Sequence, residues 1–396
     1  MHDVEVSITD VAAGGDGIGH APDGRVTFVR GAIPGDRVSV EVTDDRPRML
    51  RGVATEIVDA SADRIEPPCP HVAAGCGGCG WQHVDPTAQR RLKIRIAEEA
   101  LRRIGRLEAT IDDGPPLPTS GFRTSVRCLV VDGRAAFRTA RGHDAVVVDS
   151  CMIAHPRIEE LIAEADFGSA REVTLRVGAE TGERLVVFDP AIPDDARLPD
   201  DVLVVGADEL AAGRRAWFHD VVHDVTFRIS AESFFQTRTD GAAILVDSVR
   251  IAGEGCWGHG TFVDLYGGVG LFSACLGKGM RVTVVESNNA ATADARHNVA
   301  HVDDARIVRV PAQKWRPSPA DIVVADPPRA GLGADVVRSI ADTGAERVVL
   351  VSCDAAAFGR DARLLSEAGY VRSNTTAIDL FPQTPHVELV SRFERS

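Results

Sequence analysis

The stretch TFVDLYGGVGLFSACL at residues 261–276 predicts how the last part of the chain folds. An apolar run ends at about Asp264, and Gly267, Gly268 and Gly270 follow shortly before a second apolar run with helical length. Glycine lets the backbone turn tightly and approach a ligand closely. The order strand, glycine turn, helix therefore predicts a ligand site at the carboxyl end of the first strand of an open α/β sheet.

The next predicted strand indicates which ligand this turn holds. VTVVE at 282–286 ends in Glu286, and a carboxylate at this place can accept hydrogen bonds from both hydroxyls of a ribose. NAD and FAD favour G-x-G-x-x-G, whereas this turn reads D-x-x-G-G-x-G. An acid before a short turn suits S-adenosylmethionine, whose positive charge favours nearby carboxylates. We therefore expect this cofactor to contact Asp264, Gly268, Gly270 and Glu286.

The alternation of strand and helix continues to the C-terminus. DIVVADPPR at 321–329 and RVVLVSCD at 347–354 read as two further strands, with Asp326 and Cys353 directly after them. In a doubly wound sheet ligands bind at the carboxyl ends of the strands, so both side chains should face the crevice of the glycine turn. We expect residues 241–396 to form a Rossmann-like S-adenosylmethionine methyltransferase domain.

A thiol beside a methyl sulfonium predicts methylation at C5 of a uracil. Carbon 5 is a poor nucleophile until a thiolate adds to C6, after which C5 can attack the methyl group and must then lose its proton to a base. Cys353 can supply the thiolate and Glu388, in TPHVELV, the base, while Asp326 can hold the edge of the ring. Cys353 and Glu388 are therefore our candidate catalytic residues.

Three other functions fit parts of this pattern. An amino-group methyltransferase also uses Asp-Pro-Pro after its fourth strand but needs no cysteine. A cytosine-C5 methyltransferase uses a thiolate but carries a Pro–Cys motif, and here Ser352 precedes Cys353. A non-catalytic iron–sulfur RNA-binding protein would bind the cofactor without turnover. The combination of Cys353, Glu388 and Asp326 favours the uracil-5 chemistry.

The rest of the chain divides into two segments by pattern. Residues 1–58 contain short β-rich runs separated by glycine and proline turns, which predicts a small closed β-barrel. Residues 59–240 begin with a proline-, glycine- and cysteine-rich stretch and a helix at about 85–106, capped by Asp85. Strand-like runs follow, so we expect a mostly antiparallel central domain. The whole chain is thus predicted to be a multidomain α/β protein.

Charge gives a divided indication of the partner. The net charge of -14 argues mildly against a nucleic acid, because phosphates favour lysine and arginine. Basic residues are nevertheless dense at 90–106 and 123–141, and such a stripe can guide a polyanion on an acidic body, although a solvated face explains it as well. No long apolar stretch and no basic leader are present, so we expect a cytoplasmic monomer with no membrane partner.

The cysteines point to a metal centre. Of eight cysteines, Cys69, Cys76 and Cys79 lie within eleven residues, the last two in C-x-x-C spacing. In a cytosolic chain such thiols are more often ligands than disulfides. Four thiolates bind zinc or a 4Fe–4S cluster, and the spacing does not choose between them. A fourth ligand must come from elsewhere, with His71 and His83 as nearby alternatives.

Several motifs, in one order, resemble the bacterial RNA uracil-5-methyltransferases, which modify ribosomal and transfer RNA. The resemblance covers nearly the whole chain. It is carried by CPHVAAGCGGCGWQH (69–83), ESFFQT (232–237), DLYGGVGLF (264–272), VVESNNAATADARHN (284–298), DPPRAGL (326–332), SCDAAAFGRD (352–361) and FPQTPHVE (381–388).

The resemblance implies roles for individual residues and a substrate. It implies Cys353 as nucleophile and Glu388 as general base, and it makes 1–58 a TRAM domain, an RNA-binding module. It implies a 4Fe–4S cluster rather than zinc, and RNA, ribosomal more readily than transfer RNA, as partner. The remaining implied contacts are Gln236, Tyr266, Glu286 and Asp326 for the cofactor pocket, Phe234 and Asp326 for the target base, and Cys69, Cys76, Cys79 and Cys151 for the cluster.

The sequence departs from this family in three places. The family often has a cysteine where Gly267 stands and a proline where Ala355 stands, and neither position performs the expected chemistry. Six residues separate Cys69 from Cys76, where five are usual, so the cluster loop is expected to differ in shape.

Overall fold

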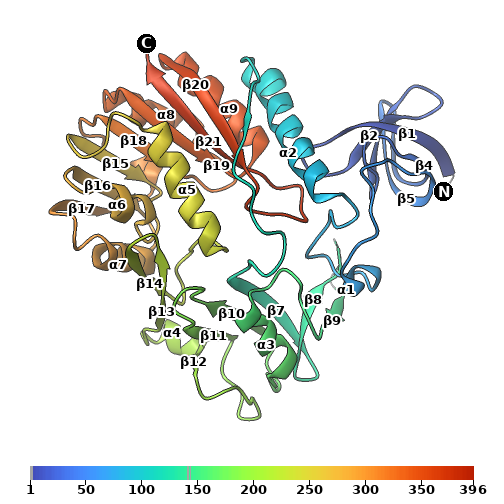
Figure 1. The fold of residues 1–396 in the computed structure, drawn as a ribbon, viewed down its shortest axis with the longest axis horizontal. Helices are drawn as coiled ribbons and strands as arrows, with labels where there is room; N and C mark the ends of the chain where they lie inside the picture. The colour runs from blue at the N-terminus through green and yellow to red at the C-terminus, as the bar shows by residue number, and fades with distance from the viewer. Residues whose placement is uncertain (1–2, 141, 143) are drawn as a thin grey trace.

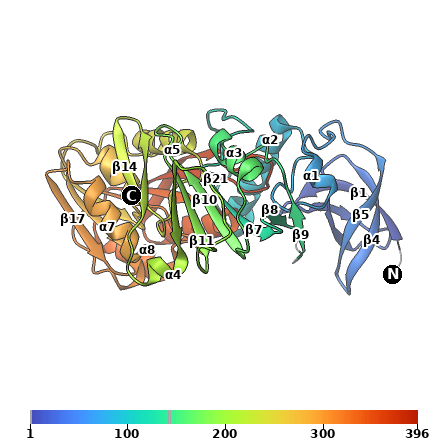
Figure 2. The ribbon, with the colours of Figure 1, turned by 90° about the horizontal axis from the view of Figure 1, so that it is seen from below.

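The computed structural model describes residues 3–140, 142 and 144–396. The chain forms three bodies, which Figure 1 shows as a blue barrel, a green central sheet and a large yellow-to-red α/β unit. Seen from below, the barrel lies at one end of an elongated molecule and the α/β unit at the other (Figure 2). No helix in these described ranges is both long and apolar enough to cross a membrane.

The N-terminal strands close into a barrel, as the sequence predicts. They pair in the order β1-β2-β3-β5-β4. Alternate residues such as Val6, Ile8, Val38 and Val40 point inward and are buried, which is the period-two pattern of a half-buried strand. The strands are β1 (Asp3–Val11), β2 (Gly17–His20), β3 (Val26–Arg30), β4 (Arg37–Arg46) and β5 (Met49–Asp59).

The central body is a mostly antiparallel sheet, also as predicted. Its order is β12-β11-β10-β7-β8-β9, and β11 pairs with β12 in parallel. The strands are β7 (Ser125–Val131), β8 (Arg134–Arg138), β9 (Ala145–Val147), β10 (Glu172–Val177), β11 (Arg184–Asp189) and β12 (Val202–Gly206). Beside it lie the helices α1 (Pro70–Ala73), α3 (Pro156–Glu164) and α4 (Ala207–Ala211) and the hairpin of β13 (Trp217–Val222) and β14 (Val225–Ser230).

The C-terminal body is a doubly wound sheet in the order β17-β16-β15-β18-β19-β21-β20-β6. The five neighbouring strands β17, β16, β15, β18 and β19 run parallel to one another. β21 pairs antiparallel with both β19 and β20. The strands are β15 (Thr261–Leu265), β16 (Arg281–Glu286), β17 (Asp304–Arg309), β18 (Ile322–Ala325), β19 (Arg347–Ser352), β20 (Tyr370–Ile378) and β21 (Glu388–Arg395).

Helices cover both faces of this sheet, which gives it an apolar core on each side. They are α5 (Thr239–Ala252), α6 (Leu271–Leu276), α7 (Asn289–Asn298), α8 (Gly333–Asp342) and α9 (Ala355–Glu367), with a 3-10 turn at Ala312–Lys314. The predicted Rossmann-like arrangement is therefore confirmed, including strands that are buried almost throughout, as parallel strands between two helical layers must be.

The helix predicted at 85–106 forms but belongs to a different neighbourhood. α2 (Pro86–Ala100) starts after Asp85, whose carboxylate accepts hydrogen bonds from Thr87 N and Ala88 N, and continues as a π-helical turn at Leu101–Gly105. It packs against α9, and β6 (Asp112–Asp113) then pairs with β20 (Figure 1). Part of the segment 59–240 is thus built into the α/β unit, although the sequence pattern assigns it to the central domain.

Candidate active site

Four strand ends bring the predicted catalytic groups to one edge of the sheet. Asp264 lies near the end of β15, Asp326 follows β18 and Cys353 follows β19. Because β21 is antiparallel to β19, with Ser352 opposite Leu389, the first residue of β21 lies beside the end of β19. Glu388 is that residue, so the chain topology places the candidate base next to the candidate nucleophile.

The cofactor turn contains a buried carboxylate with one unpaired oxygen. Asp264 is fully buried, and its Oδ2 accepts hydrogen bonds from Ser273 Oγ at 2.6 Å and Ser273 N at 3.1 Å. Its Oδ1 has no partner among the described residues. Burial raises the pKa of Asp264 to about 7. A cation at the turn would satisfy this oxygen and restore the charged form.

The glycine turn is shaped as the sequence predicts. Gly268 and Gly270 have φ angles of +54° and +87°, which side chains rarely adopt. Glu286 Oε2 accepts a hydrogen bond from Gly268 N at 3.1 Å, so the carboxylate at the end of β16 reaches the turn. Tyr266 also has a positive φ of 61°, and its hydroxyl accepts a hydrogen bond from Gln313. A Cβ on Gly267 would lie 2.6 Å from Val284 Cγ1, so glycine is the residue that this packing admits.

The candidate nucleophile, Cys353, lies among groups that disfavour negative charge. Burial, and then the neighbouring Glu388 and Asp326, raises the pKa of Cys353 to about 12, against an opposing effect of Arg329. Burial and Asp264 raise the pKa of Asp326 to about 7. Burial and Asp326 hold the pKa of Glu388 well above its ordinary value. Ionisation of Cys353, Asp326 and Glu388 is therefore disfavoured at this edge of the sheet.

This electrostatic arrangement fits a positively charged cofactor. The acidic groups influence one another in sequence from Glu286 and Asp264 through Asp326 to Glu388 and Cys353. Glu388 is 3% exposed, and its Oε1 has no hydrogen-bond partner in the described part of the chain. A sulfonium cation would lower the pKa of Asp264, Asp326, Glu388 and Cys353, because opposite charge favours the ionised form.

Phe234 and Gln236 lie in a separate loop between β14 and α5. Phe234 is 69% exposed, whereas Phe235 turns inward onto Phe227 with ring centroids 5.7 Å apart. An exposed phenylalanine on a fixed loop is available to stack on a base, while Gln236 is half-buried. Their expected roles at the target base and the cofactor stay predictions.

Two buried side chains with no role predicted from the sequence, Arg176 and Asp294, hold this loop. Arg176 Nη1 donates hydrogen bonds to the carbonyl oxygens of Ser230, Ala231 and Ser233 at 3.0, 3.1 and 2.9 Å. Asp294 on α7 accepts from Ser233 Oγ at 2.6 Å and from Ser230 N at 2.8 Å. In the sequence, Arg176 is marked only as a charged residue within a largely apolar strand, and Asp294 only as a charged residue in a helix.

The four predicted cluster cysteines come together at one cavity, which Cys353 does not line. A cavity of about 250 Å³ is lined by Cys69, Cys76, Cys79 and Cys151, together with His71 and Arg123. No group of three or more His, Cys, Asp or Glu side chains among the described residues is gathered closely enough to hold a metal ion. His83, the other candidate ligand, does not line this cavity, and burial lowers its pKa to about 4.

The remaining cysteines, Cys128, Cys256 and Cys275, take part in packing. Cys128 is buried in the core of the central sheet, and Cys256 and Cys275 pack against the core of the α/β unit.

Most of the described members of the two basic runs are engaged in ion pairs, and Arg141 lies outside the described residues. Arg103 pairs with Glu99, and Arg127 and Arg138 both pair with Glu172. Surface pairs of this kind add little stability, but they cancel much of the local positive charge. These runs therefore fit solvated faces better than a strong electrostatic guide for a polyanion.

Comparisons with known proteins cover the whole chain. A family model described as the TRAM domain matches residues 3–55, which is the barrel. The chain is 37% identical to a Streptomyces avermitilis protein described as an uncharacterized RNA methyltransferase, over 98% of each chain. It is 36% identical to a Streptomyces coelicolor protein of the same description, over 98% of this chain and 92% of the relative.

One solved structure is similar along its full length. The Pyrococcus abyssi tRNA (uracil-54, C5)-methyltransferase in complex with S-adenosyl-L-homocysteine matches with a TM-score of 0.75 and 26% identity. The match covers 98% of this chain and 99% of that one.

Proposed function

The chain belongs to the RNA methyltransferase family that its Streptomyces relatives represent, and we propose that it transfers a methyl group from S-adenosylmethionine to C5 of a uridine in RNA. The observation that carries this proposal is the adjacency of Cys353, Glu388 and Asp326 at the edge of the sheet that also holds the glycine turn. An enzyme that methylates an amino group has no use for a thiol with a carboxyl neighbour at this place.

The proposed reaction begins at Cys353. Its thiolate adds to C6 of the uracil, forming an S–C6 bond and moving the electron pair of the C5–C6 double bond to C5 and the O4 carbonyl. C5 then attacks the methyl carbon of the cofactor; the methyl–sulfonium bond breaks, and S-adenosylhomocysteine leaves. Glu388 takes the proton from C5, the double bond re-forms, and Cys353 is expelled as a thiolate.

The other site residues bind and orient in this proposal. Asp264 and Glu286 supply the carboxylates that the cofactor's positive charge and ribose require, at a turn where Gly268 leaves room for close approach. Tyr266 and Gln236 complete the cofactor pocket, Asp326 holds the pocket contents, and Phe234 stacks on the target base. The entering positive charge favours ionisation of Cys353 and Glu388, so cofactor binding prepares both groups.

The identity of the RNA has two candidates. The barrel, as an RNA-binding module on an enzyme with a cysteine centre, favours ribosomal RNA. The similarity to a solved structure that acts on transfer RNA favours the alternative. Both substrates use the same chemistry, so the choice depends on which uridine reaches Phe234 and Cys353.

The expected result that tests this function is the loss of specific 5-methyluridines. Deleting the gene from its source organism should remove this base from one or a few positions of ribosomal or transfer RNA, because the proposed enzyme alone forms each of them. Mass-spectrometric mapping of both RNA classes, with the gene restored as control, measures it. If no uridine loses a methyl group, the function proposed here is wrong.

We propose a multinuclear cluster rather than zinc for the cysteine cavity, which Cys69, Cys76, Cys79 and Cys151 line. The spacing of these thiols does not choose between the two, and the resemblance to the uracil-5-methyltransferases favours the cluster. The cationic Arg123 at the same cavity suits an anionic cluster. We assign these thiols to a 4Fe–4S cluster with a structural role, because methyl transfer needs no electron.

We expect anaerobically purified protein to contain about four iron and four acid-labile sulfide per chain. Replacing Cys79 with serine should lower both, because one ligand is lost, and the same change at Cys275, which lies in α6 of the α/β unit and does not line the cavity, should not. Zinc in place of iron, measured by elemental analysis, would contradict the assignment.

A further inference from the structure

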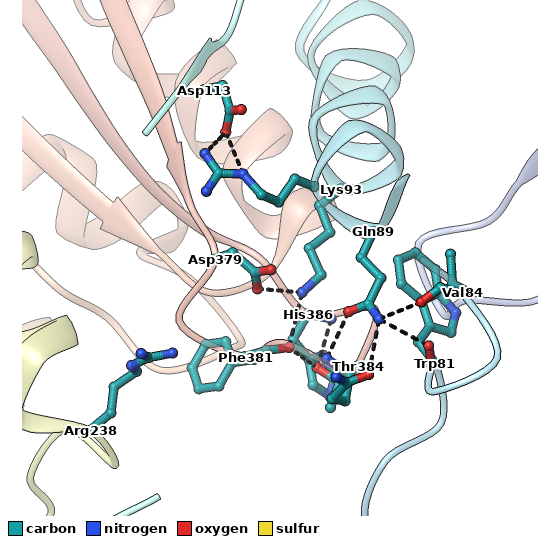
Figure 3. A network of polar contacts seen from close by, with 12 residues as sticks. Trp81, Val84, Gln89, Lys93, Asp113, Arg238, Asp379, Phe381, Thr384 and His386 are labelled. Carbon is teal, nitrogen blue, oxygen red and sulfur yellow. Dashed lines mark hydrogen bonds and ion pairs between the residues drawn. The ribbon is translucent and has the colours of Figure 1, made fainter. Parts of the chain in front are cut away.

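The segment that leads into Glu388 is unusually well held. We call residues 379–387 the base loop, because it joins β20 to Glu388, the first residue of β21. We call residues 59–83, the proline-, glycine- and cysteine-rich stretch before α2, the Cys-rich segment. Figure 3 shows Gln89 and Lys93 of α2 reaching the base loop from one side, and Trp81 of the Cys-rich segment approaching it from another. These three parts are distant in the sequence, so the contacts are not a consequence of local chain geometry.

Gln89 bonds with both of its amide atoms to the base loop. Its Oε1 accepts from Gln383 N at 2.7 Å, and its Nε2 donates to Gln383 Oε1 at 3.0 Å. The same Nε2 donates to the carbonyl oxygens of Trp81 at 3.1 Å and Val84 at 2.9 Å. Gln383 has a φ of +68°, a conformation that a side-chain-bearing residue keeps only where its surroundings fix it.

Lys93, one helical turn further along α2, anchors the start of the loop. Its ammonium group donates to Asp379 Oδ1 at 2.5 Å and to the carbonyl oxygen of Phe381 at 2.9 Å. The side chains of Lys93 and Asp379 are 1% and 10% exposed. A buried pair of this kind adds little net stability, but breaking it is costly. The pair therefore favours one arrangement of the base loop relative to α2.

The Cys-rich segment and the barrel complete the enclosure. Trp81 N donates to Gln383 O at 2.9 Å, and Trp81 Nε1 donates to Gly15 O, in the turn between β1 and β2, at 3.3 Å. A Cβ on Gly15 would lie 2.8 Å from Trp81 Nε1 and 2.9 Å from Pro385 Cβ. The barrel, the Cys-rich segment and α2 therefore all converge on the base loop.

The carboxyl group of Glu388 has no comparable restraint of its own. Its Oε1 is buried without a hydrogen-bond partner in the described residues, so no polar contact at that atom fixes it. Its position is set by the backbone that enters β21, and that backbone is the end of the base loop. A displacement of about 1 Å at a reacting group can cost about 10²-fold in rate.

We propose that Gln89 and Lys93 are positioning residues that hold the base loop and thereby place the Glu388 carboxyl for removal of the C5 proton. This inference rests on the proposed function, in which Glu388 is the base. It assigns to α2 a task in catalysis rather than only in packing, and it explains why a lysine and a glutamine stand on the buried face of this helix.

The test uses the full chain with Gln89→Met and, separately, Lys93→Met combined with Asp379→Asn, which leaves no unpaired buried charge. The probes are total RNA from the strain lacking the gene and RNA from the same strain grown with 5-fluorouracil. Fluorine at C5 cannot leave as a proton, so on that RNA the reaction stops at the covalent adduct before any base is needed.

We expect each variant to bind S-adenosylmethionine as the parent does and to form the adduct on fluorinated RNA at the parental extent. On normal RNA, kcat should fall by up to about 10²-fold and KM for RNA should fall with it, so that kcat/KM changes little. A methylated protein–RNA adduct should accumulate, because its breakdown is slowed when the base is misplaced. Lys278→Met, which removes a lysine from the exposed turn between α6 and β16, is the matched control and should leave kcat unchanged.

Other outcomes overturn the inference. A merely structural role would lower adduct formation, methylation and the folded fraction in parallel, and unchanged kcat in both variants would show that the contacts do not position the base. If the parent protein itself methylates no uridine in the same RNA, the proposed function has failed and not this inference alone.

Discussion

Methyl transfer is expected to disappear when Cys353 is replaced with alanine. The proposed reaction activates C5 only through an S–C6 bond, so loss of the sulfur removes the path itself and should lower kcat by at least about 10⁴-fold. Binding of S-adenosylmethionine should persist, because the thiol is separate from the carboxylates of the glycine turn. Incorporation of labelled methyl groups into RNA from the deletion strain, beside calorimetric cofactor binding, measures both.

Cys275→Ala is the matched control for this change. Burial raises the pKa of Cys275 to about 12, as at Cys353, but Cys275 lies in α6 and packs against the core. It should retain activity. An active Cys353→Ala protein would contradict the covalent mechanism and favour an enzyme that methylates an amino group by direct attack, which the Asp-Pro-Pro sequence after β18 also permits.

The α/β unit could be predicted from the sequence because its signals are local. Each buried strand ends in glycine, acid or cysteine at the edge where ligands bind, and Asp264, Glu286, Asp326 and Cys353 lie there as predicted. The pairing of Glu388 with this set was harder to predict from pattern, because it depends on β21 running antiparallel beside β19. Motif order, rather than periodicity, indicated it.

The supports of the site could not be predicted, because they depend on contacts between distant segments. Gln89 and Lys93 lie on the same face of α2 as buried Leu92 and Ile96, where a polar residue has no obvious partner until the fold brings residues 379–383 to it. The attachment of α2 to the α/β unit was missed for the same reason. An amphipathic helix shows which face is buried but not which domain covers it.

Replacing Glu388 with glutamine should stop the reaction one step later than loss of the thiol does. Glutamine keeps the size of the side chain but cannot accept the C5 proton, and Cys353 cannot leave until that proton is lost. We expect kcat to fall by about 10²- to 10⁴-fold and a methylated RNA adduct on the peptide carrying Cys353 to accumulate. Denaturing gels of labelled complexes, followed by mass spectrometry of that peptide, measure the adduct.

The raised pKa of Glu388 predicts the direction in which turnover changes with pH. Burial and Asp326 hold the pKa of Glu388 above its ordinary value, so at low pH the group is protonated and cannot act as a base. Turnover of the parent protein should therefore rise with pH as Glu388 ionises. The yield of adduct in Glu388→Gln should not show this rise, because the ionising group is absent.

Glu394→Gln, further along β21 and paired with Arg347 and Arg392 away from the site, is the matched control and should turn over normally. If Glu388→Gln forms no adduct at all, the carboxyl acts earlier, on the thiol proton of Cys353. In that case the interaction between Glu388 and Cys353 serves to activate the nucleophile, and Glu388 does not remove the C5 proton.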